Sequence, residues 1–199
     1  MSKLELTDAI ELINPNIELV EGYRHATYVS DDGDRLPMII ATASKSVLFE
    51  LFISLISRLG VTIDFVLDDD RNGFIDYRES IDTAVLVSIL IEFEELLLND
   101  GMLGVAAMNP GRGLEVQLEE HKMLVIYGSP QELFEFELES YGVLENEGIR
   151  TIYDYEHRHV WGEDHEERLD ELRVALGLDG TEFDDDDELL TDHLHPPEA

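Results

Sequence analysis

Residues 68–79 combine carboxylate and amide side chains at a regular spacing. The residues at this spacing are four carboxylates and one amide: Asp68, Asp70, Asp76, Glu79 and Asn72. Calcium binds six to eight hard oxygen ligands at about 2.3–2.6 Å, and alternate residues of a tightly curled loop can direct such oxygens at one point. Carboxylates held close together otherwise repel one another, so a divalent cation would remove an electrostatic cost. We therefore expect residues 68–79 to form a calcium-binding loop.

The spacing of these residues resembles the calcium loop of EF-hand proteins. The resemblance implies side-chain ligands at Asp68, Asp70 and Asn72, a backbone carbonyl ligand at Phe74, a water-mediated ligand at Asp76 and a bidentate carboxylate at Glu79. It also implies a sharp turn at Gly73 and an inward-packed side chain at Ile75.

The segments beside this loop differ from those of an EF-hand. Residues 61–67 alternate between apolar and polar side chains, which predicts a strand where an EF-hand has a helix. The chain contains no second copy of the loop, so we expect a static structural clip rather than a calcium sensor. The alternative is a solvated connection from a strand to a helix, in which Asn72 and Gly73 turn the chain and Asp76 caps the helix.

A second candidate metal site lies at His157, His159 and Glu163. Alternate side chains of a strand share a face, so the imidazoles of His157 and His159 would lie side by side. With Glu163 they spell His-x-His-x-x-x-Glu, which is similar to the first metal motif of cupins. The flanking glycines and the second histidine motif of that family are absent, and a helix carrying His165 follows. A polar strand end is therefore expected in preference to a transition-metal centre.

These residues must be positioned by alternating strands and helices. Residue periodicity and turn residues predict strands within residues 17–30 and at 37–41, 61–67, 102–108, 114–127 (interrupted near 120–121) and 149–157. Helical spacing and caps predict helices at residues 4–13, 46–59, 79–98, 129–141 and 164–176. This order predicts an α+β (mixed α/β) fold, with a mixed, largely antiparallel sheet of about five to seven strands and helices packed on it. We expect one globular domain at residues 1–177 and an acidic, mobile tail at residues 178–199.

The composition excludes several classes of partner. The chain has 199 residues, 46 acidic and 13 basic, for a net charge of −33, and 44% of its residues are hydrophobic. That hydrophobic share is too high for a disordered acidic chain. A surface with this much negative charge repels the phosphate backbone of nucleic acids and the anionic leaflet of a membrane. We therefore expect neither nucleic acid nor a membrane as a partner. The absence of cysteine and of a signal-peptide pattern favours the cytoplasm.

No hydrolase nucleophile elbow, dinucleotide-binding fingerprint or kinase motif occurs in the sequence. We therefore expect an acidic binding or interaction domain, clipped by calcium, rather than an enzyme. One alternative is an acidic partner of a basic protein surface, including a protein that imitates the charge of DNA. Another is a metal-dependent enzyme that uses His157, His159 and Glu163.

Overall fold

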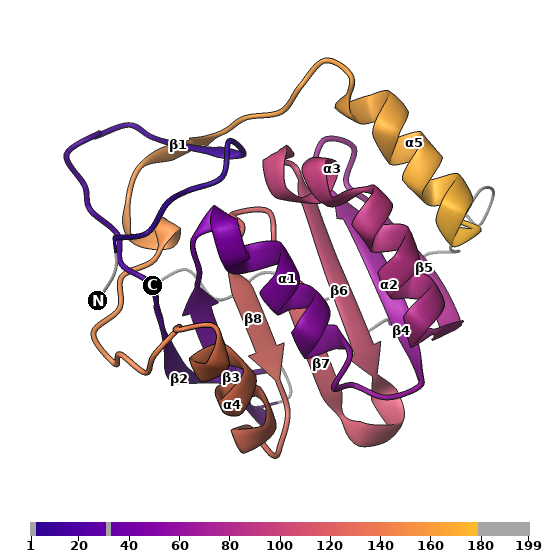
Figure 1. Cartoon of the computed structure of the whole chain (residues 1–199), viewed down its shortest axis with the longest axis horizontal. Coiled ribbons are helices and arrows are strands. Elements are labelled where there is room, and N and C mark those ends of the chain that lie inside the picture. Colours follow the sequence, from indigo (N-terminus) through magenta and orange to yellow (C-terminus); the bar gives the residue numbers. More distant parts are fainter. Residues whose placement is uncertain (1–2, 31–32, 179–199) are drawn as a thin grey trace.

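An antiparallel sheet of seven strands forms the centre of the computed structural model, which describes residues 3–30 and 33–178 (Figure 1). The strand order is β2-β3-β8-β7-β6-β4-β5, and every pairing is antiparallel. The strands are β2 (Gly22–Val29), β3 (Arg35–Thr42), β4 (Thr62–Asp69), β5 (Phe74–Asp82), β6 (Leu103–Asn109), β7 (Leu114–Leu118) and β8 (Leu124–Tyr127). The expected α+β fold class is confirmed.

The helices of the described chain lie on one face of this sheet (Figure 1). They are α1 (Lys45–Ile56), α2 (Thr83–Glu92), α3 (Glu94–Asn99), α4 (Glu132–Ser140) and α5 (His165–Leu176). Alternate strand residues such as Phe65 and Val116 meet α1 residues such as Phe52 in one buried core. Within the described residues, no helix is long and apolar enough to cross a membrane.

A second, two-stranded sheet pairs β1 (Ile10–Leu12) with β9 (His157–His159). It lies beyond the end of the main sheet at which β7 turns into β8 (Figure 1). The helix expected at residues 4–13 is therefore wrong, because the backbone of β1 pairs with that of β9. The strand expected at residues 149–157 is mostly replaced by the short 3-10 helix η2 (Ile152–Asp154), and strand structure begins only at His157.

The helix expected from residue 79 starts four residues later. Residues 79–82 belong to β5, which pairs with β4. The Asp82 carboxylate accepts hydrogen bonds from the backbone N–H groups of Ala84 (2.9 Å) and Val85 (3.2 Å), so the helix begins at Thr83. A break at Phe93 then separates α2 from α3. Similarly, α4 begins at Glu132 rather than at residue 129, and a 3-10 turn, η1 (Pro110–Arg112), joins β6 to β7.

Helix α5 ends at Leu176, which is where the sequence predicts the end of this helix. Gly177 caps the helix in the left-handed conformation, with φ of 71°, which glycine adopts without steric cost. Leu178 is 3% exposed and belongs to the main core. The acidic tail expected at residues 178–199 lies, from residue 179 onward, outside the described residues.

Candidate metal centre

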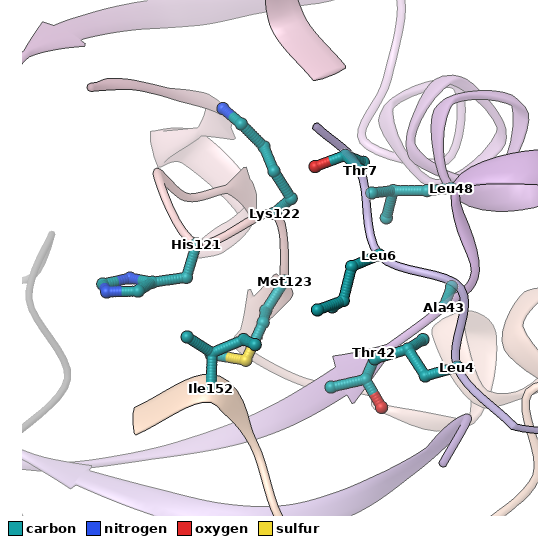
Figure 2. Close-up of a pocket in the computed structure, with 10 residues that line it drawn as sticks. All are labelled: Leu4, Leu6, Thr7, Thr42, Ala43, Leu48, His121, Lys122, Met123 and Ile152. Carbon is teal, nitrogen blue, oxygen red and sulfur yellow. The ribbon is translucent and has the colours of Figure 1, made fainter. Parts of the chain in front are cut away.

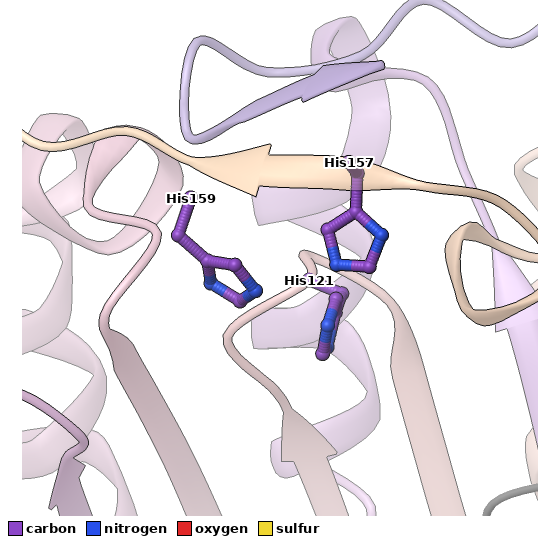
Figure 3. A group of neighbouring side chains, drawn as sticks. All are labelled: His121, His157 and His159. Carbon is purple, nitrogen blue, oxygen red and sulfur yellow. The ribbon is translucent and has the colours of Figure 1, made fainter. Parts of the chain in front are cut away.

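Three histidines, His121, His157 and His159, gather between the two sheets, and Figure 3 shows their rings turned toward one another. The ring centroids lie 4.8 Å (121 to 157), 4.7 Å (121 to 159) and 5.2 Å (157 to 159) apart. One candidate ligand nitrogen from each ring lies within 4.8 Å of the other two. The three side chains therefore form a group small enough to share one metal ion.

The turn between β7 and β8 positions His121. The Glu119 backbone N–H donates to the carbonyl of Met123 (3.1 Å), and the Lys122 N–H donates to the carbonyl of Glu119 (2.9 Å). The Glu119 carboxylate also accepts a hydrogen bond from the Met123 N–H through Oε1 (3.0 Å). These bonds fix a short turn that leaves His121 only 7% exposed.

Pairing with β1 positions the other two histidines. His157 and His159 lie opposite Leu12 and Ile10, respectively, and both rings lie on one face of β9 because side chains alternate along a strand. Just after β9, the Gly101 N–H donates to the carbonyl of Val160 (2.8 Å). A Cβ atom on residue 101 would lie 2.3 Å from the carbonyl oxygen of Ala9. Glycine is therefore required at position 101 for the small sheet to approach this closely.

Each of the three rings uses its Nδ1 atom in a hydrogen bond to an oxygen. The acceptors are Glu119 Oε2 for His121 (2.7 Å), the Tyr155 carbonyl for His157 (2.8 Å) and the Gly101 carbonyl for His159. Carbonyl and carboxylate oxygens carry no proton, so Nδ1 must be the donor in all three cases. In the neutral rings the lone pair is then on Nε2, which is the atom left to bind a metal ion. The same arrangement orients histidine ligands in known metal sites.

The distances suit a small transition-metal ion. Zinc binds histidine nitrogens at about 2.0–2.1 Å, which places tetrahedral ligands roughly 3.4 Å apart, so the ligand nitrogens would close by at most about 1.4 Å. Three histidines leave one tetrahedral position for water or another molecule, as in catalytic zinc sites. His157 and His159 are half-buried, so the histidine group lies at the edge of the protein interior.

Two carboxylates lie on the Nδ1 side of His121. Glu119 Oε2 also accepts a hydrogen bond from the Tyr153 hydroxyl (2.6 Å), and Glu120 Oε1 lies 3.1 Å from His121 Nδ1. Glu119, Glu120 and His121 form a second group of closely spaced candidate ligands. Because the Glu119 carboxylate already accepts bonds from His121, Met123 and Tyr153, we assign to it the orientation of the His121 ring.

These contacts shift several pKa values. Burial opposes protonation of His121, but hydrogen bonds to Glu119 and Glu120 and the charges of both outweigh it and raise the pKa of His121 to about 9. Burial lowers the pKa of His157, and positive charge on His121 and His159 lowers it further. Burial, with the charges of Glu119 and Glu120, raises the pKa of the Tyr153 hydroxyl. A metal ion must therefore displace a proton from His121 at neutral pH.

Of the residues singled out in the sequence, His157 and His159 come together and Glu163 does not. Glu163 is exposed in the segment between β9 and α5 and belongs to neither group of clustered candidate ligands in the described chain. His165 lies at the start of α5, where its Nδ1 is 3.3 Å from Asp100 Oδ2. His121 was not expected from the sequence, and the signal that could have suggested it is the run Glu119-Glu120-His121 in a turn between two strands.

The calcium-loop residues lie on a β-hairpin. Asp68 is in β4, Asp70 and Asn72 are in the turn, and Phe74, Asp76 and Glu79 are in β5. Asp68 pairs with Ile75, and Leu67 pairs with Asp76. Since paired residues share a face and successive residues alternate, the side chains of Asp68 and Asp76 point to opposite faces of the hairpin. The structure therefore does not bring these two carboxylates together.

One of these carboxylates already has a cationic partner. Asp76 Oδ2 accepts a hydrogen bond from Arg173 Nε of α5 (2.8 Å), and Arg173 Nη2 also lies 3.5 Å from the buried carboxylate of Asp69. Calcium binding at residues 68–79 stays a prediction. It would require the hairpin to rearrange and Asp76 to leave Arg173.

A small cavity lies on the backbone side of the turn that carries His121 (Figure 2). Its volume is about 10 Å³, roughly the space for one water molecule. The His121 ring points away from the apolar side chains that line this cavity (Figure 2). Lys122 Nζ donates to the Leu103 carbonyl (2.6 Å), and burial lowers the pKa of Lys122 to about 8. The cavity is too small to hold an organic substrate.

A comparison of the chain with models of known protein families gave no match, and neither did comparisons with curated protein sequences or with solved structures.

Proposed function

We propose that this protein binds one transition-metal ion of the zinc class through Nε2 of His121, His157 and His159. The observation that carries the proposal is that three imidazole rings lie in one small group and the Nδ1 of each ring is engaged with an oxygen acceptor. Nε2 of each ring is then the nitrogen left for a metal ion, once His121 has lost its proton. Imidazole ligands suit zinc, copper, iron and nickel, whereas calcium and magnesium prefer oxygen. The proposal keeps His157 and His159 of the expected metal motif and takes His121 in place of Glu163.

The ion would connect the two sheets. His157 and His159 belong to β9 of the small sheet, and His121 belongs to the β7–β8 turn of the main sheet. A bound ion would therefore hold the small sheet against the main one and add its binding free energy to the free energy of unfolding. The fourth position would accept a water molecule or an exchangeable ligand.

The proposal is tested by titrating zinc into chelator-treated protein and measuring heat by calorimetry. We expect one ion per chain, no comparable heat with magnesium, and an affinity at least a hundredfold lower in each of His121→Ala, His157→Ala and His159→Ala. Two controls carry histidine changes outside the group: His25→Ala, on β2 beside Glu135, and the pair His193→Ala and His195→Ala. Zinc binding that survives all three single changes in the group, or that is lost in a control, would refute the proposal.

The net charge of −33 supports a second proposal, that the partner of this protein is a basic protein surface. An attraction of that kind is screened by salt. Capture of a basic partner at low ionic strength should therefore be reversed at high ionic strength. Capture that is independent of salt would contradict it.

A further inference from the structure

A second cavity lies on the face of the main sheet opposite the helices. Its volume is about 380 Å³, which is within the range of about 300–1,000 Å³ that is common for small-molecule sites. Side chains of β2, β3 and β8 form an apolar floor: Ala26, Met38, Ile40 and Val125. The segment around η2 supplies one wall through Tyr153 and Asp154. The cavity is thus distinct from the metal centre, although Tyr153 contributes to the surroundings of both.

The cavity has one cationic side chain, Arg24 of β2. The side chain of Arg24 has neither a hydrogen bond nor an ion pair within the described residues, although the chain has 46 acidic residues. The carboxylate of Asp154, which also lines the cavity, is already engaged, since its Oδ2 accepts a hydrogen bond from the Thr151 N–H (2.7 Å). The guanidinium of Arg24 is therefore a charged group that lines the cavity and has no partner in the described part of the chain.

These features define the ligand chemistry. A guanidinium binds a carboxylate through two parallel hydrogen bonds, and the apolar floor suits a hydrocarbon or aromatic body. A dianion such as a phosphate monoester fits less well, because there is one arginine, Asp154 is close by, and the whole chain is strongly negative. At physiological salt the Debye length is about 8 Å, so the local charge of Arg24 outweighs the distant acidic residues.

We propose that this cavity binds a small organic monocarboxylate, with the carboxylate on Arg24 and the apolar body over Ala26, Met38 and Val125. This inference goes beyond metal binding and does not depend on it. Neither Arg24 nor Ala26 belongs to the histidine group, so the two proposals can fail separately.

The test is calorimetric titration with 4-phenylbutyrate and with its primary amide, which has the same size and a neutral amide group in place of the carboxylate. We expect the acid to bind at least tenfold more tightly than the amide at about 0.15 M salt. Arg24→Gln should abolish this preference, because the neutral amide of glutamine cannot form the paired charged hydrogen bonds. Arg35→Gln, at the far end of the β2–β3 pair and outside the cavity lining, is the matched control and should keep the preference.

A second variant tests the floor independently of charge. Ala26→Leu should weaken binding of both the acid and the amide at least fivefold by filling the cavity, while its melting temperature confirms that it is folded. The proposal is overturned if the acid gives no heat at millimolar concentration, if acid and amide bind equally to the parent protein, or if Arg24→Gln leaves their ratio unchanged.

Discussion

Glu119 accepts a hydrogen bond from Nδ1 of His121, with 2.7 Å between carboxylate oxygen and ring nitrogen. The side chain of Glu119 is only 3% exposed, so water does not compete for this contact. The bond fixes the proton of the neutral ring on Nδ1 and directs the lone pair of Nε2 away from the carboxylate.

Replacing Glu119 by glutamine should weaken zinc binding by about 10- to 100-fold, the usual effect of losing a carboxylate that orients a histidine ligand. The same change should lower the pKa of His121, which NMR titration of the ring protons would follow. Glu95→Gln, at an exposed position of α3, is the control. A folded Glu119→Gln protein with unchanged zinc affinity and an unchanged His121 pKa would contradict this role.

Glu115 should reduce stability at neutral pH. Burial raises its pKa, an effect that the hydrogen bond from Gln117 Nε2 (2.6 Å) only partly offsets. A carboxyl group with a raised folded-state pKa destabilises the protein as the pH rises above its unfolded value of about 4.5. Glu115→Gln should therefore melt at a higher temperature than the parent at pH 7, with a difference that vanishes below pH 4.5. If Glu115→Gln instead melts at a lower temperature than the parent at pH 7, the charge of Glu115 stabilises the fold and the prediction is wrong.

Arg71 compensates two buried carboxylates. Its Nε lies 2.8 Å from Asp69 Oδ1 and its Nη1 lies 3.0 Å from Asp100 Oδ2, and the two aspartates are 1% and 0% exposed. Arg71→Met should cost about 3–5 kcal/mol of unfolding free energy, because it leaves buried charges without their main partner. Lys3→Met, which breaks an exposed ion pair with Glu18, should change the free energy of unfolding by less than about 1 kcal/mol. Chemical denaturation measures both, and equal effects would refute the role assigned to Arg71.

Calcium binding at residues 68–79 should be limited by Arg173. Because Arg173 holds the Asp76 carboxylate, Arg173→Gln should bind calcium at least tenfold more tightly than the parent protein, and adding Glu79→Gln should reverse the gain. Calorimetric titration of the three proteins tests this. Equal heats of calcium binding in the parent and in Arg173→Gln, or no heat in either protein, would refute a calcium site at residues 68–79.

The sequence was sufficient to predict features that depend on neighbouring residues alone, such as helix ends and the alternation of side chains along a strand. Gly177 marks the end of α5, and alternation correctly placed His157 and His159 on one face of β9. The hairpin at residues 68–79 was not foreseen, because β5 lies at the edge of the sheet and carries polar residues such as Asp76, Arg78 and Glu79, which are typical of a loop. Edge strands tolerate such residues since one side of the strand faces solvent.

The histidine group could not be predicted from local signals. His121 and His157 are 36 positions apart in the sequence, and they meet only because β9 pairs with β1 and Gly101 allows the small sheet to approach β6. The spacing of the sequence instead suggested Glu163 as the third ligand. That residue lies past the end of β9, where the chain leaves the group and leads into α5.

The most direct test of the metal centre is a crystal structure of the zinc-loaded protein with anomalous diffraction data collected on both sides of the zinc absorption edge. We predict one strong peak about 2.0–2.1 Å from Nε2 of His121, His157 and His159. A peak on the Nδ1 side of His121 beside Glu119 and Glu120, or anomalous density only at other residues, would contradict it.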